Sequence, residues 1–428
     1  MRQRDQRCSN HPSPSGGPSM SSSDKIRSDG PAPTAGYSDA ARTAVQETTK
    51  RVQEMHGAIA DTYFGILRRM PLLSAPAQLV RAAHDTIAGG VYGAIHYGSG
   101  GLLGAAATVE KRATGFAPGK PPGRLASGLR SALNGAFGDH LAASNNLLAI
   151  RMAFHVGGVP ITLDAAALRQ TFAEAGKRLC VFIHGLGCDE HCWEGDDRGA
   201  ASEVDFGRRL QAEFACTPLY LRYNSGLPIA HNGAQLAGLL EELLAAWPQP
   251  ASELLLIGHS MGGLLALSAC EHAAAADLRW PHATAMLICL GSPNLGSSVE
   301  RLGQLTNAAL NLSRITAPLG KIAATRSQGV KDLRHGPGAP RRDPAHDHIA
   351  FRFLGASLAE DADHPLGKFV GDGLVTLDSA TAHVIEGDVQ SVSIGKLGHL
   401  QLLTDARVYR QISEWIAGLD DHQQLGTR

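Results

Sequence analysis

The sequence has almost no net charge, since 39 Lys and Arg residues oppose 40 Asp and Glu residues and leave a formal charge of −1. Without a surplus of one sign, no global electrostatic field attracts the chain to nucleic acid or to an anionic membrane. We therefore expect no nucleic-acid partner. With 428 residues, of which 43% are hydrophobic, the chain is nevertheless long enough to bury a large core.

Cysteine is also scarce, and its seven residues are odd in number. Several lie inside apolar runs such as 178–183 and 286–290, which favours small buried side chains in a reducing compartment over a disulfide framework. The first residues are charged and then rich in Ser, Pro and Gly, with no apolar run before a small-residue cleavage site. Because no secretory signal is recognisable there, we expect a cytoplasmic location.

The part of the chain before residue 146 divides into two regions. Residues 1–40 contain Ser, Pro, Gly and scattered charge with almost no large apolar side chain, which predicts a disordered tail. Residues 41–145 show helical spacing, for example at Ile59 and Tyr63, and predict a small helical region. A Pro- and Gly-rich break at 118–123 precedes the last helix of that region.

Residues 86–109 carry no charge and are long enough to cross a bilayer if they are apolar enough. They are rich in Gly and Ala and include His96, so transfer into lipid is unfavourable. We expect a glycine-rich helix pair that lies on the main domain. The alternative is a peripheral membrane or lipid-surface contact through residues 41–110.

From residue 146 onward, strand patterns alternate with helical patterns. Gly157 and Gly158 join two apolar runs and predict a tight β-hairpin over 147–163. The alternation predicts an α/β domain over 146–428, with a mostly parallel sheet and helices on both faces. The strands are expected at 178–183, 219–223, 253–257, 284–290 and 349–354. Residues 300–347 break the rhythm and predict a lid-like insertion.

The most informative motif is Gly258-His259-Ser260-Met261-Gly262-Gly263, which lies between an apolar strand and a helical run. A serine on a sharp strand-to-helix turn exposes its hydroxyl above the sheet, and the following helix directs its amide groups toward the same point. This predicts Ser260 as a nucleophile. A glycine-rich turn without chemistry and a phosphate-binding loop are the alternatives, although neither phosphate-loop nor dinucleotide spacing is present at this turn.

A serine nucleophile requires a histidine base and an acid that orients it, in the order Ser, Asp or Glu, His. Asp372 stands in a glycine-flanked turn, and His399 follows the apolar strand 391–394. We predict these two residues as the catalytic partners of Ser260, although an aspartate in such a turn can also be a turn former only. The competing residues are His364, His383, Asp363, Asp378 and Glu386.

A second loop is expected to complete the site. His184-Gly185-Leu186-Gly187 follows the strand 180–183, so its amides can turn toward the space above Ser260. We predict an oxyanion hole formed by the backbone N–H groups of Leu186 and Met261. His184 and His259 are then structural residues and not bases.

Cys188-Asp189-Glu190-His191-Cys192 comes next and resembles half of a metal site. No second Cys/His pair stands at a zinc-finger distance, so we expect a mobile loop at the pocket mouth, with a structural zinc as the alternative. Trp193 either lines the acyl pocket or is an exposed loop residue.

With these motifs in place, residues 149–419 resemble the α/β-hydrolase superfamily, especially bacterial lipase-like and deacylase-like esterases. The strings that carry the resemblance are His184-Gly185-Leu186-Gly187, Tyr223-Asn224-Ser225-Gly226, Gly258-His259-Ser260-Met261-Gly262, Leu290-Gly291-Ser292-Pro293-Asn294-Leu295-Gly296 and Gly371-Asp372-Gly373-Leu374-Val375. The resemblance implies ester hydrolysis through an acyl-serine intermediate, with no cofactor and no metal. Many lipase relatives carry a His where Asn294 stands, which is a departure from their pattern.

The leading hypothesis is a serine esterase or lipase-like enzyme that acts on a small-molecule or lipid ester. A thioesterase or an acyltransferase would use the same three residues. The hypothesis from another class is a non-catalytic protein that binds a lipid surface or a partner, in which the helical region carries the function. The intact set of Ser260, Asp372 and His399 argues against it.

Overall fold

A computed structural model describes residues 124–173, 176–194, 204–249, 253–297, 327–335, 346–362, 364–381 and 387–426, together with Gln46, Arg81 and Asp85. All of these residues belong to one compact unit, Pro33–Arg428. The predicted tail, residues 1–40, lies outside the described residues, as do residues 86–109. The predicted insertion at 300–347 is described only at 327–335 and 346–347.

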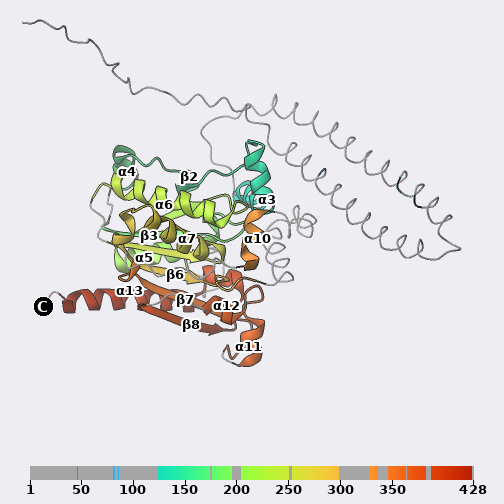
Figure 1. Cartoon of the computed structure of the whole chain (residues 1–428). Helices are drawn as coiled ribbons and strands as arrows, with labels where there is room; N and C mark the ends of the chain where they lie inside the picture. Colours follow the sequence, from blue (N-terminus) through green and yellow to red (C-terminus); the bar gives the residue numbers. More distant parts are fainter. Residues whose placement is uncertain are drawn as a thin grey trace, which may run out of the picture. The chain divides into compact units, whose positions relative to one another are not determined.

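The core is an eight-stranded sheet in the order β2-β1-β4-β3-β5-β6-β7-β8 (Figure 1). The strands are β1 (Ala153–Val156), β2 (Val159–Pro160), β3 (Arg178–Ile183), β4 (Cys216–Arg222), β5 (Glu253–His259), β6 (Thr284–Leu290), β7 (Ala350–Ser357) and β8 (Val389–Gly395). β1 runs antiparallel to β2 and β4, and every pair from β4 to β8 is parallel. The predicted α/β fold with a mostly parallel sheet is therefore confirmed.

The connections between the strands are largely helical. The α-helices are α3 (Arg124–Ala143), α4 (Ala165–Thr171), α5 (Phe206–Phe214), α6 (Ile229–Ala246), α7 (Met261–Ala275), α10 (Gln328–His335), α11 (Pro365–Val370), α12 (Leu377–Thr381) and α13 (Ala406–Gly426). Short 3-10 helices are η1 (Glu190–Trp193), η2 (Trp280–Ala283) and η4 (His399–Leu403).

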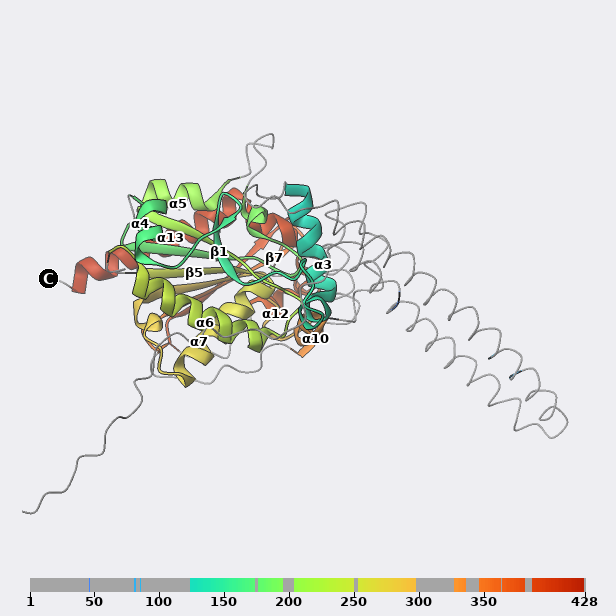
Figure 2. The ribbon, with the colours of Figure 1, turned by 90° about the horizontal axis from the view of Figure 1, so that it is seen from above.

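Successive side chains of each central strand enter two different cores, one on each face of the sheet. In β3, Val181 joins the core that contains residues of α6 and α7, and Phe182 joins the core that contains residues of α5 and α13. Figure 2 shows these two helix layers on opposite sides of the sheet. Burial on both faces explains why the central strands are continuously apolar and do not alternate with polar residues.

The predicted hairpin forms, but its first strand is shorter than expected. Gly157 and Gly158 have φ angles of 56° and 79°, so they make the tight turn between β1 and β2. Strand pairing begins only at Ala153, because the preceding backbone bonds to Asn134 of α3 instead. Asn134 donates to the Leu148 carbonyl at 2.8 Å and accepts from the Ile150 amide at 2.9 Å.

The six cysteines within the described residues are all free. Five of them are buried, and only Cys192 is half-buried. The interpretation of the cysteines as small core side chains is confirmed for these residues. In the described part of the chain, no helix combines the length and the apolar character needed to span a membrane.

Candidate active site

Ser260 occupies the turn between β5 and α7 in a strained backbone conformation, with φ 55° and ψ −122°. The strand enters the helix so sharply that a Cβ on Gly258 would lie 2.4 Å from the Gly263 nitrogen, and a Cβ on Gly262 would lie 2.2 Å from the Ile183 oxygen. Only glycine fits at such approaches, which explains the spacing of the motif. The turn is anchored by the Ser260 amide, which donates to the Leu290 carbonyl at 2.8 Å.

Asp372 and His399 form a buried pair. His399 Nδ1 lies 2.6 Å from Asp372 Oδ2, and both side chains are almost inaccessible to solvent. Because a carboxylate accepts, Nδ1 carries the proton, and the lone pair of the neutral ring is at Nε2. Asp372 is also a turn former, since its Oδ1 accepts from the amides of Leu374 and Val375 at 2.9 and 2.7 Å.

The structure brings this pair to the same edge of the sheet as Ser260. Gly291 directly follows Leu290, whose carbonyl anchors the serine turn. A Cβ on Gly291 would lie 3.2 Å from Asp372 Oδ2 and 3.3 Å from His399 Nδ1. The Ser260 hydroxyl is buried and makes no hydrogen bond to any described residue, so its bond to the imidazole is not formed in this structure. Catalytic hydrogen bonds of this kind often tighten only when substrate is bound.

Two of the five competing residues are described, and both lie at the surface. His364 and Asp378 are exposed. Asp363, His383 and Glu386 lie outside the described residues.

The amides predicted for the oxyanion hole lie at the ends of neighbouring strands. Leu186 follows β3, and Met261 is the first residue of α7 after β5. The amides of Gly187 and Cys188 are engaged, by Ser225 Oγ at 2.9 Å and by the Gly185 carbonyl at 3.3 Å. No hydrogen bond from the amides of Leu186 and Met261 to another described residue is formed, which is compatible with the predicted role.

The two other histidines of the motifs hold the site together. His184 Nε2 accepts from the Tyr223 amide at 3.3 Å, and the two rings stack with centroids 4.4 Å apart. Burial lowers the pKa of His184 to about 4, so the ring is neutral near pH 7. Both observations agree with the predicted structural role.

His259 supports His399, which the sequence alone did not indicate. Its Nε2 lies 3.0 Å from the His399 carbonyl and must therefore donate, and the two rings lie 4.6 Å apart. Burial and the neighbouring His399 hold the pKa of His259 well below its ordinary value. Because the His259 ring stays neutral, its Nε2–H still donates to the His399 carbonyl, and no positive charge is added beside His399.

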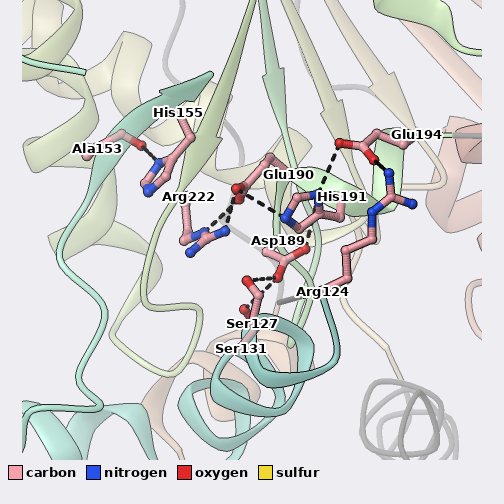
Figure 3. Close-up of polar contacts among 10 residues, drawn as sticks. All are labelled: Arg124, Ser127, Ser131, Ala153, His155, Asp189, Glu190, His191, Glu194 and Arg222. Atoms are coloured by element: carbon pink, nitrogen blue, oxygen red, sulfur yellow. Dashed lines mark hydrogen bonds and ion pairs between the residues drawn. The ribbon is translucent and has the colours of Figure 1, made fainter. Parts of the chain in front are cut away.

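The segment 188–193 differs from the expectation of a mobile loop at the pocket mouth. Asp189 and Glu190 are buried, and the segment forms η1 (Figure 3). Glu190 makes a buried ion pair with Arg222, and Asp189 accepts from hydroxyls of α3. These partners offset the penalty of removing two carboxylates from water, which is why so polar a sequence lies inside.

The structure excludes one of the two expectations for Trp193, and its place in the acyl pocket stays a prediction. Trp193 is 1% exposed, so it is not an exposed loop residue. It packs against Phe182 and Phe206 in the core and approaches the edge of His259, with centroids 6.4 Å apart. Among the residues whose side chains are described, no group of His, Cys, Asp and Glu has the arrangement of a metal site.

A cavity of about 1220 Å³ lies apart from the catalytic candidates, between α3, β1 and α6. Buried Arg222 and His155 contribute to its lining, together with Ile150 and Leu239. Neither Ser260 nor the Asp372–His399 pair lines it. The cavity is therefore a feature of the junction between α3 and α6 and is separate from the serine turn.

Comparisons with known proteins identify the family of the chain. The sequence model of a family described as the alpha/beta hydrolase family matches residues 180–411, more than half of the chain. Similar solved structures include a Bacillus licheniformis lipase, BlEst2, in mature form (18% identity, 63% of this chain and 98% of that chain, TM-score 0.40) and a thermophilic esterase from Thermogutta terrifontis (16%, 63% and 93%, TM-score 0.33). A search of curated proteins gave no match.

Proposed function

Because the chain belongs to the alpha/beta hydrolase family, we propose that it is a serine hydrolase that cleaves carboxylic esters through an acyl-serine intermediate. The observation that carries the proposal is the buried Asp372–His399 pair at 2.6 Å, at the sheet edge where the strained turn presents Ser260. A hydroxyl is a weak nucleophile until an oriented base removes its proton, and this pair supplies such a base.

The proposed reaction has two halves. Ser260 Oγ attacks the ester carbonyl while His399 Nε2 takes its proton, and the carbonyl oxygen becomes an oxyanion held by the amides of Leu186 and Met261. When the tetrahedral intermediate collapses, the C–O bond to the alcohol breaks and the leaving alkoxide takes the proton from His399. Water then attacks the acyl group by the same route and releases the acid, with Asp372 orienting the imidazole throughout.

The test is hydrolysis of p-nitrophenyl esters by the full chain and by Ser260→Ala. We expect activity in the wild-type protein, and loss of nearly all of it in the variant, because the acyl acceptor is removed. Ser268→Ala is the matched control, since it removes another buried hydroxyl, from the helix that follows Ser260, and should leave turnover unchanged. Undiminished turnover by folded Ser260→Ala would refute the proposal.

The products decide the class of acyl transfer. With an ester substrate and a competing alcohol, a hydrolase releases mainly free acid, and an acyltransferase forms mainly a new ester. A preference for thioester substrates would instead identify a thioesterase.

The proposal also includes a cytoplasmic location and a peripheral contact with lipid. A reducing cytoplasm is supported by the free thiols of the described cysteines. Peripheral contact of residues 41–110 with lipid stays a prediction, and sedimentation with vesicles of anionic and neutral lipid, using the full chain and a chain without those residues, tests it.

A further inference from the structure

We propose that helix α3 is a positioning element of the active site: it holds the segment after β3 so that the Leu186 amide meets the oxyanion. The inference rests on the proposed function. Helix α3 precedes the matched family region, which begins at residue 180, whereas the segment after β3 lies inside it. Two contacts carry the inference: Asp189 bonds to serines of α3, and Gly135 of α3 meets the turn that contains Leu186.

One face of α3 is made of small residues at helical spacing. Ser127, Ser131 and Gly135 follow one another at intervals of four residues and therefore share a face. All three meet the segment after β3. Their small size lets the helix backbone approach that segment directly.

The hydroxyl groups on this face satisfy a buried carboxylate. Asp189 is 3% exposed, and its Oδ2 accepts from Ser127 Oγ at 2.6 Å and from Ser131 Oγ at 3.3 Å (Figure 3). Its Oδ1 accepts from the His191 amide at 3.1 Å and so caps η1. Because a buried carboxylate is strongly destabilised without its donors, Asp189 ties the position of η1 to α3.

Gly135 meets the turn that contains Leu186. A Cβ on Gly135 would lie 2.9 Å from Gly187 Cα and 3.5 Å from Leu186 Cδ1. The Gly187 amide is also fixed by Ser225 Oγ, to which it donates at 2.9 Å. The turn is therefore held between α3 and the segment after β4, and a displacement of α3 displaces Leu186.

The helix is also held by Ser327 and by the start of α10. Ser327 Oγ donates to the Gly135 carbonyl at 2.8 Å, and the Gln328 amide donates to Asp139 Oδ2 at 3.0 Å. Figures 1 and 2 both show α10 beside α3. A retreat of Gly135 from an added methyl group would therefore strain the hydrogen bond with Ser327.

The experiment compares Gly135→Ala with Gly128→Ala in the full chain. Both variants add one methyl group to α3, but a Cβ on Gly128 has no atom within 4 Å. We expect Gly135→Ala to lower kcat for a p-nitrophenyl ester by roughly 10- to 100-fold, because a small misplacement of an oxyanion donor affects mainly the transition state. KM should change by less than about twofold in both variants, and kcat of Gly128→Ala should match the wild type.

A second readout separates positioning from a merely structural contact. An arylboronic acid that forms a tetrahedral adduct at Ser260 should bind Gly135→Ala more weakly by about the same factor as kcat falls, because the adduct mimics the transition state. Thermal unfolding of each variant gives the folded fraction to which kcat is normalised. If Gly135→Ala does not fold, Ser127→Ala/Ser131→Ala decides by the same measurements, since it removes two donors to Asp189 and adds no volume.

An unchanged kcat per folded molecule, with or without a lower melting temperature, would overturn the inference. That outcome leaves the proposed function intact when Ser260→Ala is inactive. Full turnover in Ser260→Ala would instead refute the proposed function itself.

Discussion

The turn after β5 and the segment after β3 both end at the proposed catalytic site, but they are held in place in different ways. The turn that carries Ser260 is fixed by close backbone packing, since a Cβ on Gly258 would lie 2.4 Å from the Gly263 nitrogen, and by the hydrogen bond from the Ser260 amide to the Leu290 carbonyl. The segment after β3 depends on distant residues, because Asp189 bonds to a hydroxyl 62 positions away and Glu190 pairs with Arg222, 32 positions away. The first arrangement rests on uncharged backbone contacts. The second is long-range, buried and charged.

The largest expected effect on stability comes from breaking the charged arrangement. Glu190→Gln leaves the Arg222 guanidinium buried without its counter-charge, since the two side chains are only 4% and 6% exposed. We expect the free energy of unfolding to fall by about 3 to 5 kcal/mol, measured by denaturant titration. Glu414→Gln, at an exposed position of α13, is the control and should be neutral.

A double variant shows whether the loss comes from the unpaired charge. Glu190→Met/Arg222→Met replaces both ions with apolar side chains, and it should recover most of the lost stability. If Glu190→Gln is as stable as the wild type, the buried pair does not hold this segment, and the contrast with the serine turn disappears.

Acid should weaken the same region by a comparable amount. Burial lowers the pKa of His184 to about 4, whereas an unfolded chain binds this proton near 6.5. Below pH 6.5, His184 therefore binds a proton in the unfolded state but not in the native state. The free energy of unfolding falls until the pH reaches about 4. The loss from His184 is about 3 kcal/mol, and His259 adds to it in the same direction.

Denaturant titrations at pH 7, 5.5 and 4.5 measure this slope. His184→Gln should flatten it, and His140→Gln, an exposed position at the end of α3, should leave it unchanged. An equal slope in His184→Gln and the wild type would show that His184 does not carry the acid sensitivity.

The local features could be predicted from the sequence because short stretches determine them. β3 (Arg178–Ile183) and β6 (Thr284–Leu290) have the predicted bounds, since their apolar runs end in polar or turn-forming residues. The strand-to-helix turn at Ser260 was also predictable, because glycines must stand where backbones nearly touch. The Asp372–His399 contact follows from the order of the chain in such sheets.

The segment after β3 could not be predicted in this way. Its polar residues suggest an exposed loop or a metal site. They are buried because Arg222 and two serines of α3 supply their partners. Arg222 stands at the end of an apolar strand, and this position indicates a buried acidic partner. The spacing of Ser127, Ser131 and Gly135 was a signal of close helix packing, but neither signal identifies its partner without the fold.

The smallest expected effect on stability tests the backbone packing at the turn that carries Ser260. Gly258→Ala places a Cβ 2.4 Å from the Gly263 nitrogen, so strand and helix must separate, and we expect a loss of about 1 to 3 kcal/mol in the free energy of unfolding. Gly238→Ala is the matched control, since its Cβ has no atom within 4 Å and alanine favours the helix by up to about 1 kcal/mol. Equal stability of Gly258→Ala and Gly238→Ala would mean that the serine turn can relax, and the two regions would then differ less than their contacts indicate.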